Sequence, residues 1–169
     1  SDVWLAQISR KFLVAERSER NFFAVGDRVL CAPAAKDQTH NSDLPQCTIL
    51  KLSRRRSRLA RKDPHTSELE HVLASNIDQL IVVASYQKPK LKWGLIDRYL
   101  VLAEQEGIPA AIVINKRDLV EEDAKEKQEE FSARVALYRK LSYPVFLLQA
   151  NAEDAESDEA TQELGTYLK

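Results

Sequence analysis

Residues 110–120 read Ala110-Ala-Ile-Val-Ile-Asn115-Lys-Arg-Asp118-Leu-Val120, a short apolar run that ends in a polar tetrad. The small and β-branched residues of the run follow Pro109 and precede charged residues, which is typical of a buried strand. In open parallel sheets, ligands bind at the carboxyl ends of the strands, and the tetrad begins at such an end. This stretch therefore predicts a parallel α/β sheet with a binding site at one edge.

The side chains of the tetrad suit a guanine base. The Asp118 carboxylate can accept the N1 and N2 hydrogens of guanine as a bidentate pair, which adenine does not offer. The Asn115 amide can reach O6 and N7 of the base or brace the loop, and the aliphatic stem of Lys116 can cover the ring face. The alternative interpretation is a solvated loop in which Asn and Asp act as turn or capping residues.

Length and composition describe a globular protein. With 169 residues and 44% hydrophobic content, the chain can bury one core or two small ones. No apolar run approaches the roughly 20 residues of a membrane span, and no signal sequence opens the chain, so we expect a cytoplasmic protein that does not bind membranes. Cys31 and Cys47 have no Cys or His neighbour at zinc-ligand spacing, and we expect no metal site in this chain.

The net charge of −1 hides an uneven distribution. Residues 1–65 carry 13 basic and 7 acidic residues, whereas residues 66–169 carry 12 basic and 19 acidic residues. Such asymmetry suggests two modules with different partners, the first of which faces a polyanion. We therefore expect one domain over residues 1–65 and a second over residues 66–169.

Short apolar segments indicate that the first domain is a small β-barrel of the OB type. Strands are expected at residues 4–8, 12–15, 22–25, 28–32 and 47–53, and Gly26-Asp27 supplies a turn between two of them. Five short strands at this spacing fit an OB-like fold.

An arginine-rich segment follows the last of these strands and contains no acidic residue. On the rim of a barrel it would follow the phosphates of RNA, and binding would weaken with salt. The alternative is a solvated linker whose charges only keep the chain soluble. The residues expected to bind RNA are Lys51, Arg54, Arg55, Arg56, Arg58, Arg61 and Lys62.

The second domain alternates strands with helices, which predicts a parallel α/β sheet. Strands are expected at residues 80–84, 110–114 and 145–148, and helices at residues 95–106, 122–141 and near 157–168. A guanine site of this kind should be accompanied by a phosphate-binding loop, G-x-x-x-x-G-K-[ST]. The four glycines, Gly26, Gly94, Gly107 and Gly165, do not have that spacing, so the loop is absent from this chain.

Several segments resemble a known family in the family's own order. They are Val25-Gly-Asp-Arg-Val29, the arginine-rich residues 54–61, Asn76-Ile-Asp-Gln-Leu-Ile-Val-Val83, residues 95–104 and residues 112–119. Together they resemble the ribosome small-subunit-dependent GTPase A family, whose GTPase domain is circularly permuted. The resemblance implies an amino-terminal OB-fold that contacts ribosomal RNA, the first part of a permuted P-loop GTPase domain, and a carboxyl-terminal zinc-binding domain.

The resemblance also assigns residues. The family's guanine motif falls on Asn115, Lys116 and Asp118, with Arg117 at its variable position. The family's second guanine motif, Ser-Ala-Lys, falls on Gln149, Ala150 and Asn151, so that only Ala150 is kept. The ligands of Mg²⁺ and zinc have no counterpart here, and we expect no catalytic residue in this chain.

The sequence therefore predicts the amino-terminal fragment of a GTPase. The whole protein is expected to be a monomer that binds GTP or GDP, associates with the small ribosomal subunit and its rRNA, and hydrolyses GTP during late assembly of that subunit. The alternatives are an RNA-binding module or a protein-interaction module with no nucleotide role.

Overall fold

The computed structural model describes residues 3–8, 23–34, 44–62, 70–149 and 159–169. Contacts between residues divide the chain into two compact units, Ser1–Ile77 (unit 1) and Asp78–Lys169 (unit 2). The boundary expected after residue 65 falls outside the described residues, and the strand that follows it, β5 (Glu70–Ser75), belongs to unit 1. Within the described ranges, no helix has the length and apolar character needed to cross a membrane.

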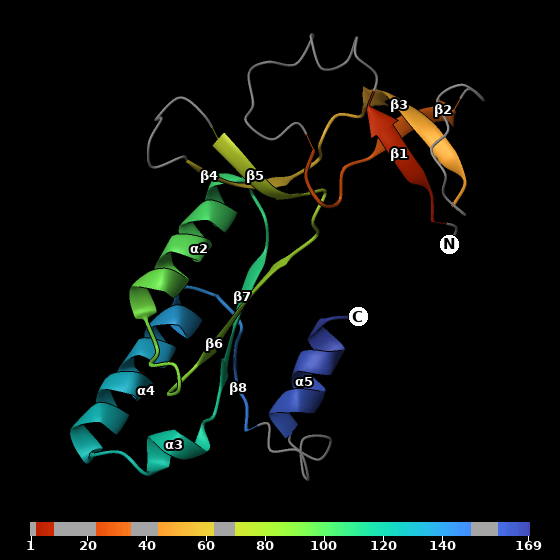
Figure 1. Cartoon of the computed structure of the whole chain (residues 1–169). Coiled ribbons are helices and arrows are strands. Elements are labelled where there is room, and N and C mark those ends of the chain that lie inside the picture. Colours follow the sequence, from red (N-terminus) through yellow and green to blue (C-terminus); the bar gives the residue numbers. More distant parts are fainter. Residues whose placement is uncertain (1–2, 9–22, 35–43, 63–69, 150–158) are drawn as a thin grey trace. The chain divides into compact units, whose positions relative to one another are not determined.

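The described residues of unit 1 form two small sheets (Figure 1). The first has the strand order β1 (Leu5–Ile8), β3 (Gln46–Leu52), β2 (Val29–Pro33). In this sheet β3 pairs antiparallel with β2 and parallel with β1. The second sheet is an antiparallel pair of β4 (Arg58–Lys62) and β5.

These sheets differ from the expected OB-like barrel. The described residues of unit 1 form no closed barrel, and the strand expected at residues 12–15 lies outside them. Of the strand expected at residues 22–25, the described part contributes only a single bridge between Val25 and Ala74.

The arginine-rich segment contains a strand that the sequence analysis missed. In β4, basic residues occupy three of the five positions, so the apolar alternation that marks a strand is confined to Leu59 and Ala60. Leu59 is nevertheless buried, and so is Val72 of β5, the partner of Ala60 in the ladder. Tertiary pairing, not local composition, therefore makes this segment a strand.

Unit 2 confirms the predicted parallel sheet. Its strands follow the order β6 (Leu80–Ser85), β7 (Ala110–Asn115), β8 (Val145–Leu147), and both pairings are parallel. The central strand β7 is the core of the unit, because Ile112 and Ile114 are fully buried. Burial of each such side chain stabilises the fold by about 1.5–3 kcal/mol.

Helix α2 (Trp93–Gln105) covers one face of this sheet (Figure 1). Its buried residues, Ile96, Leu100 and Ala103, recur at helical spacing, whereas Leu95 is exposed. Gly107, two residues after the end of the helix, has a φ of 64° in the left-handed region. The Ile108 N–H there donates to the Ala103 carbonyl at 2.8 Å, which is a common way to end a helix.

The helix expected at residues 122–141 is confirmed, although it begins three residues later and a separate short helix precedes it. A short helix, α3 (Asp118–Glu121), precedes α4 (Lys125–Lys140), because Ala124 adopts an extended conformation. The buried face of α4 consists of Phe131, Val135 and Tyr138. The Tyr138 hydroxyl donates to the Asp97 carboxylate at 2.6 Å and so joins α4 to α2.

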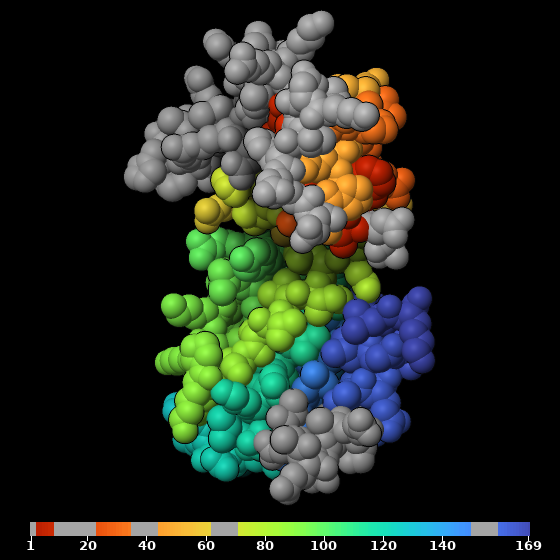
Figure 2. Space-filling model, turned by 45° about the vertical axis from the view of Figure 1, so that its right-hand side comes forward, coloured from red at the N-terminus to blue at the C-terminus, as the bar shows by residue number. Residues whose placement is uncertain are grey.

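Helices cover both faces of the unit 2 sheet. Helices α2 and α4 lie on one side, and α5 (Glu159–Tyr167) lies on the other, next to β8 (Figure 1). The rings of Phe146 and Tyr167, 5.4 Å apart, hold α5 against β8. In the space-filling view, α5 forms part of the outer surface of unit 2 (Figure 2).

Candidate functional site

The carboxyl ends of all three strands of unit 2 lie at one edge of the sheet. Ser85 of β6 is opposite Asn115 of β7, and Ile114 of β7 is opposite Leu147 of β8. The predicted tetrad leaves β7 at this edge, so the structure places Asn115, Lys116 and Asp118 where open parallel sheets bind ligands.

Asn115 and Lys116 hold the tetrad in a defined conformation. The Asn115 side-chain oxygen accepts a hydrogen bond from the Lys116 N–H at 2.6 Å, so Asn115 braces the loop. Lys116 has a φ of 64°, a conformation that costs energy for any residue with a Cβ. Its Nζ donates to the carbonyls of Gln87 and Lys88 at 3.2 and 2.7 Å. The lysine stem is therefore held across the edge of the sheet.

The Asp118 carboxylate has no hydrogen-bond partner among the described residues. It is half-buried at the start of α3, and among the described residues nothing donates a hydrogen bond to its side chain. Arg117, at the variable position, has an exposed side chain, and its N–H donates to the Leu148 carbonyl at 3.0 Å. The Asp118 carboxylate is thus free to accept hydrogen bonds from a ligand.

The second guanine motif is described only in part. Gln149 is half-buried and directly follows Leu148, whose carbonyl is bonded to the tetrad. Ala150 and Asn151 lie outside the described residues. The loops that follow β7 and β8 therefore meet at the site, as far as they are described.

Asp123, in the turn after α3, binds the loop after β6, and no sequence motif marks it. Its carboxylate accepts hydrogen bonds from the Tyr86 hydroxyl at 3.1 Å, from Gln87 Nε2 at 3.2 Å and from Lys127 Nζ at 2.7 Å. The bond from Lys127 is the main reason why the pKa of Asp123 is lowered. One sequence signal could have identified this loop, because residues 86–88 follow a strand that ends at the same sheet edge.

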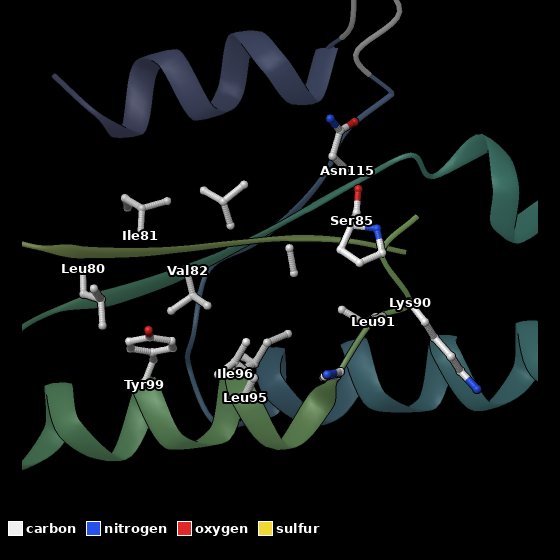
Figure 3. A pocket seen from close by; sticks show the side chains of 14 residues that line it. Leu80, Ile81, Val82, Ser85, Lys90, Leu91, Leu95, Ile96, Tyr99 and Asn115 are labelled. Atoms are coloured by element: carbon white, nitrogen blue, oxygen red, sulfur yellow. The ribbon is translucent and has the colours of Figure 1, made fainter. Parts of the chain in front are cut away.

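A hollow of about 650 Å³ lies between β6 and α2. Figure 3 shows Leu80 and Val82 pointing toward α2, while Ile81 points toward the opposite face of the sheet. Ser85 and Asn115 lie at one end of the hollow, so the tetrad borders it.

The predicted RNA-binding residues do not all have the same environment. Arg54, Arg56, Arg61 and Lys51 are exposed, Arg58 is half-buried, and the side chain of Lys62 is not described. Arg55 differs from the others, because only 11% of its side chain is exposed. Its Nε and its terminal nitrogen donate to the two oxygens of Asp27 at 2.8 and 2.9 Å.

Asp27 is the centre of a buried polar cluster in unit 1, formed with Arg55, Ser75 and the backbone of Ala24. Ser75 Oγ donates to its carboxylate at 2.6 Å, and the Ala24 N–H donates at 2.8 Å. Burial alone would raise the pKa of Asp27, but the hydrogen bonds from Arg55, Ser75 and Ala24 and the charge of Arg55 lower it to about 2. This Asp27 cluster ties the segment before β2 to the segments that flank β4 and β5.

Gly26 allows the segment before β2 to approach β5 closely. Its φ is 91°, and a Cβ at this position would lie 2.1 Å from the Ser75 carbonyl oxygen. Asn76 closes the same junction, because its Nδ2 donates to the Gly26 carbonyl and its Oδ1 accepts the Arg56 N–H, each at 2.8 Å. The expected turn at Gly26-Asp27 therefore also anchors the arginine-rich segment.

The described residues offer no metal centre. Within the described ranges, no group of three or more His, Cys, Asp or Glu side chains is arranged to hold a metal ion. Cys31 is exposed, and Cys47 is buried. The sheet edge can recognise a planar ligand that carries hydrogen-bond donors.

Comparisons with known proteins agree on one family. A model of the RsgA GTPase family matches residues 52–169. A small ribosomal subunit biogenesis GTPase RsgA of Chlorobaculum tepidum is 37% identical over 155 residues, which cover 89% of this chain and 46% of that protein. One of Histophilus somni is 39% identical over 97 residues, which cover 57% of this chain and 27% of that protein. The chain thus spans about half the length of the first of these relatives.

Solved structures show the same fold. YjeQ from Thermotoga maritima superposes with a TM-score of 0.60 and 24% identity, and the match covers 97% of this chain and 48% of that chain. YloQ, described as a circularly permuted GTPase, gives a TM-score of 0.50 and 25% identity over 84% of this chain and 42% of that chain. The resemblance found in the sequence is confirmed, and the chain belongs to the RsgA GTPase family.

Proposed function

We propose that this chain is the RNA-binding and guanine-recognising part of a GTPase that acts in biogenesis of the small ribosomal subunit. The observation that carries the proposal is the tetrad at the carboxyl end of β7, where the Asp118 carboxylate has no partner among the described residues and Lys116 is held in place. The relatives support it, because they are named small ribosomal subunit biogenesis GTPases.

In this proposal guanine binds at the sheet edge of unit 2. Asp118 accepts the N1 and N2 hydrogens of the base, and the stem of Lys116 packs on the ring face. Asn115 positions both residues through its bond to the Lys116 N–H. Ala150 is the expected contact to the guanine O6 through its backbone N–H.

We assign the rRNA contacts to unit 1, and propose that its sheets belong to an OB-like domain. The contacts are made by Lys51, Arg54, Arg56, Arg58, Arg61 and Lys62. Arg55 supports them without touching RNA, since its guanidinium is engaged by Asp27. The whole protein is proposed to be a cytoplasmic monomer.

Binding of GTP or GDP by the whole protein requires phosphate and Mg²⁺ ligands from outside these 169 residues. This chain has no G-x-x-x-x-G-K-[ST] loop, and its described residues include no metal-ligand cluster. Positioning and charge stabilisation of the transferred phosphoryl group therefore cannot come from the described residues. Zinc, which the sequence resemblance implies, likewise finds no ligand set among the described residues.

The chain of 169 residues should not hydrolyse GTP above background, whereas the whole protein should hydrolyse it. Purified small ribosomal subunits should accelerate the reaction of the whole protein. Phosphate release measured for both proteins, with and without subunits, tests the proposal. Turnover by the 169 residues alone would contradict it, and so would a whole protein that binds RNA but neither binds nor hydrolyses GTP.

Replacing Asp123 by asparagine should weaken guanine-nucleotide binding by the whole protein about 2- to 30-fold, the range for residues that act through a neighbour. An amide accepts fewer hydrogen bonds than a carboxylate, so the contacts to Tyr86 and Gln87 loosen, and with them the carbonyls that hold Lys116. Equilibrium titration with fluorescent GDP measures the effect. Glu129→Gln, an exposed change of the same charge on α4, is the control and should leave the affinity unaltered.

A further inference from the structure

The connection between β6 and α2 is the most basic segment of unit 2. Residues 86–93 read Tyr86-Gln-Lys-Pro-Lys-Leu-Lys-Trp93, with a lysine at every second position from 88 to 92 and no acidic residue. We call this segment the lysine loop. It stands out because acidic residues outnumber basic ones over residues 66–169.

The lysine loop is held in a fixed conformation by its neighbours. The Tyr86 N–H donates to the Asn115 carbonyl, and the Leu91 N–H donates to the Tyr86 carbonyl, both at 3.0 Å. Asp123 holds the side chains of Tyr86 and Gln87, and Lys116 Nζ binds two backbone carbonyls of the loop. Binding of a ligand to this loop would therefore cost little conformational entropy, because the loop is already ordered.

The three ammonium groups of the loop are available. Lys88, Lys90 and Lys92 are exposed, and among the described residues none of them has an ion-pair or side-chain hydrogen-bond partner. Figure 3 shows Lys90 extending away from the sheet on the side of α2 and α4. Three unpaired cations within five residues create a local positive potential.

Aromatic side chains lie next to these lysines. Lys88 and Lys90 border a hollow of about 500 Å³ that is also lined by Tyr86, Trp93 and Phe131. Trp93 is half-buried and packs on Phe131, with ring centroids 5.7 Å apart, so its position is fixed. The hollow is large enough for a nucleobase.

Acidic residues of α4 and of the turn before it reduce this potential only in part. Asp123 and Glu130 line the same hollow. The Asp123 charge is paired with Lys127 at 2.7 Å, which leaves Glu130 as the one unpaired acid against Lys88 and Lys90 in the lining of the hollow. The hollow and its rim therefore keep a net positive charge.

We propose that the lysine loop binds single-stranded RNA, with the lysines on the phosphates and Trp93 as a stacking platform for one base. Cations beside a fixed aromatic ring are how proteins bind single strands without reading sequence. An acidic peptide would use the lysines but not the ring, and for that reason RNA is the favoured partner. Only the choice of ribosomal RNA as the natural strand rests on the proposed function.

The test compares two variants of the whole protein. Lys90→Gln/Lys92→Gln removes two charges from the loop and leaves Lys88, whose carbonyl holds Lys116. Lys125→Gln/Lys140→Gln removes two exposed charges from α4 and is the matched control. Binding to purified small ribosomal subunits is measured over a range of salt concentrations. The loop variant should bind more weakly, and its slope of log affinity against log salt should fall by about 1.4, whereas the control should keep the wild-type slope.

Fluorescence of Trp93 gives a second readout. In a Trp4→Phe variant of the 169-residue chain, a 12-nucleotide polyuridine should quench Trp93, and neither inorganic phosphate nor polyglutamate should do so. Equal salt slopes for the loop variant and the control would overturn the inference, as would polyglutamate that competes for the loop as well as RNA does. GDP binding by the wild-type protein is measured in parallel. If the protein does not bind GDP, the proposed function is contradicted but the inference about the lysine loop is not. The RNA measurements test only the inference about the lysine loop.

Discussion

Replacing Asp118 by asparagine should weaken the binding of GDP to the whole protein about 100-fold, which corresponds to about 3 kcal/mol. The carboxylate is proposed to accept two hydrogen bonds from guanine, and bonds to a charged acceptor contribute roughly 1.5–3 kcal/mol each. The Asp118 carboxylate makes no hydrogen bond to any described residue, so replacing Asp118 should not disturb the fold. Equilibrium titration with GDP and thermal unfolding, measured on the same samples, separate the two effects.

The nucleotide xanthosine diphosphate gives this experiment its control. Xanthine carries an oxygen where guanine carries the N2 amine, and an asparagine amide can donate to that oxygen while accepting from N1–H. The Asp118→Asn variant should therefore bind xanthosine diphosphate better than GDP, the reverse of the wild-type preference. Glu122→Gln, an exposed change of the same charge nearby, should alter neither affinity. Unchanged GDP affinity in the Asp118→Asn variant would show that guanine is not read by this carboxylate.

Replacing Asp27 by alanine should destabilise unit 1 by about 3–5 kcal/mol, since the change leaves the Arg55 guanidinium buried without its counter-charge. Each unit contains one tryptophan, Trp4 and Trp93, so urea unfolding can be followed for each. In a Trp93→Phe background, the fluorescence of Trp4 should show that unit 1 unfolds at a lower urea concentration. In a Trp4→Phe background, the fluorescence of Trp93 should show that unit 2 unfolds at an unchanged urea concentration.

The double variant Asp27→Ala/Arg55→Ala tests whether the two side chains act as a pair. It should be less destabilised than the sum of the single variants, because neither charge is then left alone. Strict additivity would contradict the role assigned to the Asp27 cluster.

The stability of unit 1 should also depend on pH. Because the folded pKa of Asp27 is about 2, below the value near 3.9 of an unfolded aspartate, about 2 kcal/mol present above pH 4 should be lost as the pH falls toward 2.

Local sequence predicted the fold well where one face or one whole strand is apolar. The run from Ala110 to Ile114 is buried throughout, and helix α2 buries the residues that its periodicity marks. Unit 1 was harder to predict, since its strands are short and partly charged. β4 is held by its pairing with β5, and β1 pairs with a strand that lies about 40 residues later, neither of which a local pattern can encode.

The sequence proposes the candidate site residue by residue, but it does not reveal the side chains that support the site. Sequence spacing identifies Asp118 because the motif is continuous along the chain. The contacts of Asp123 with Tyr86 and Gln87 cross more than 30 positions, and only the shared sheet edge brings them together. For the same reason composition placed Arg55 among the RNA-binding arginines, although its partner Asp27 lies 28 positions away.

The positive φ of Lys116 sets stability and recognition against each other at one position. A glycine there would adopt the same backbone conformation without strain and would relax the loop. It would also remove the ammonium group that binds the loop after β6. At this position the bonds that the ammonium group makes to the Gln87 and Lys88 carbonyls therefore offset the cost of the left-handed backbone, and a glycine would give up the first to remove the second.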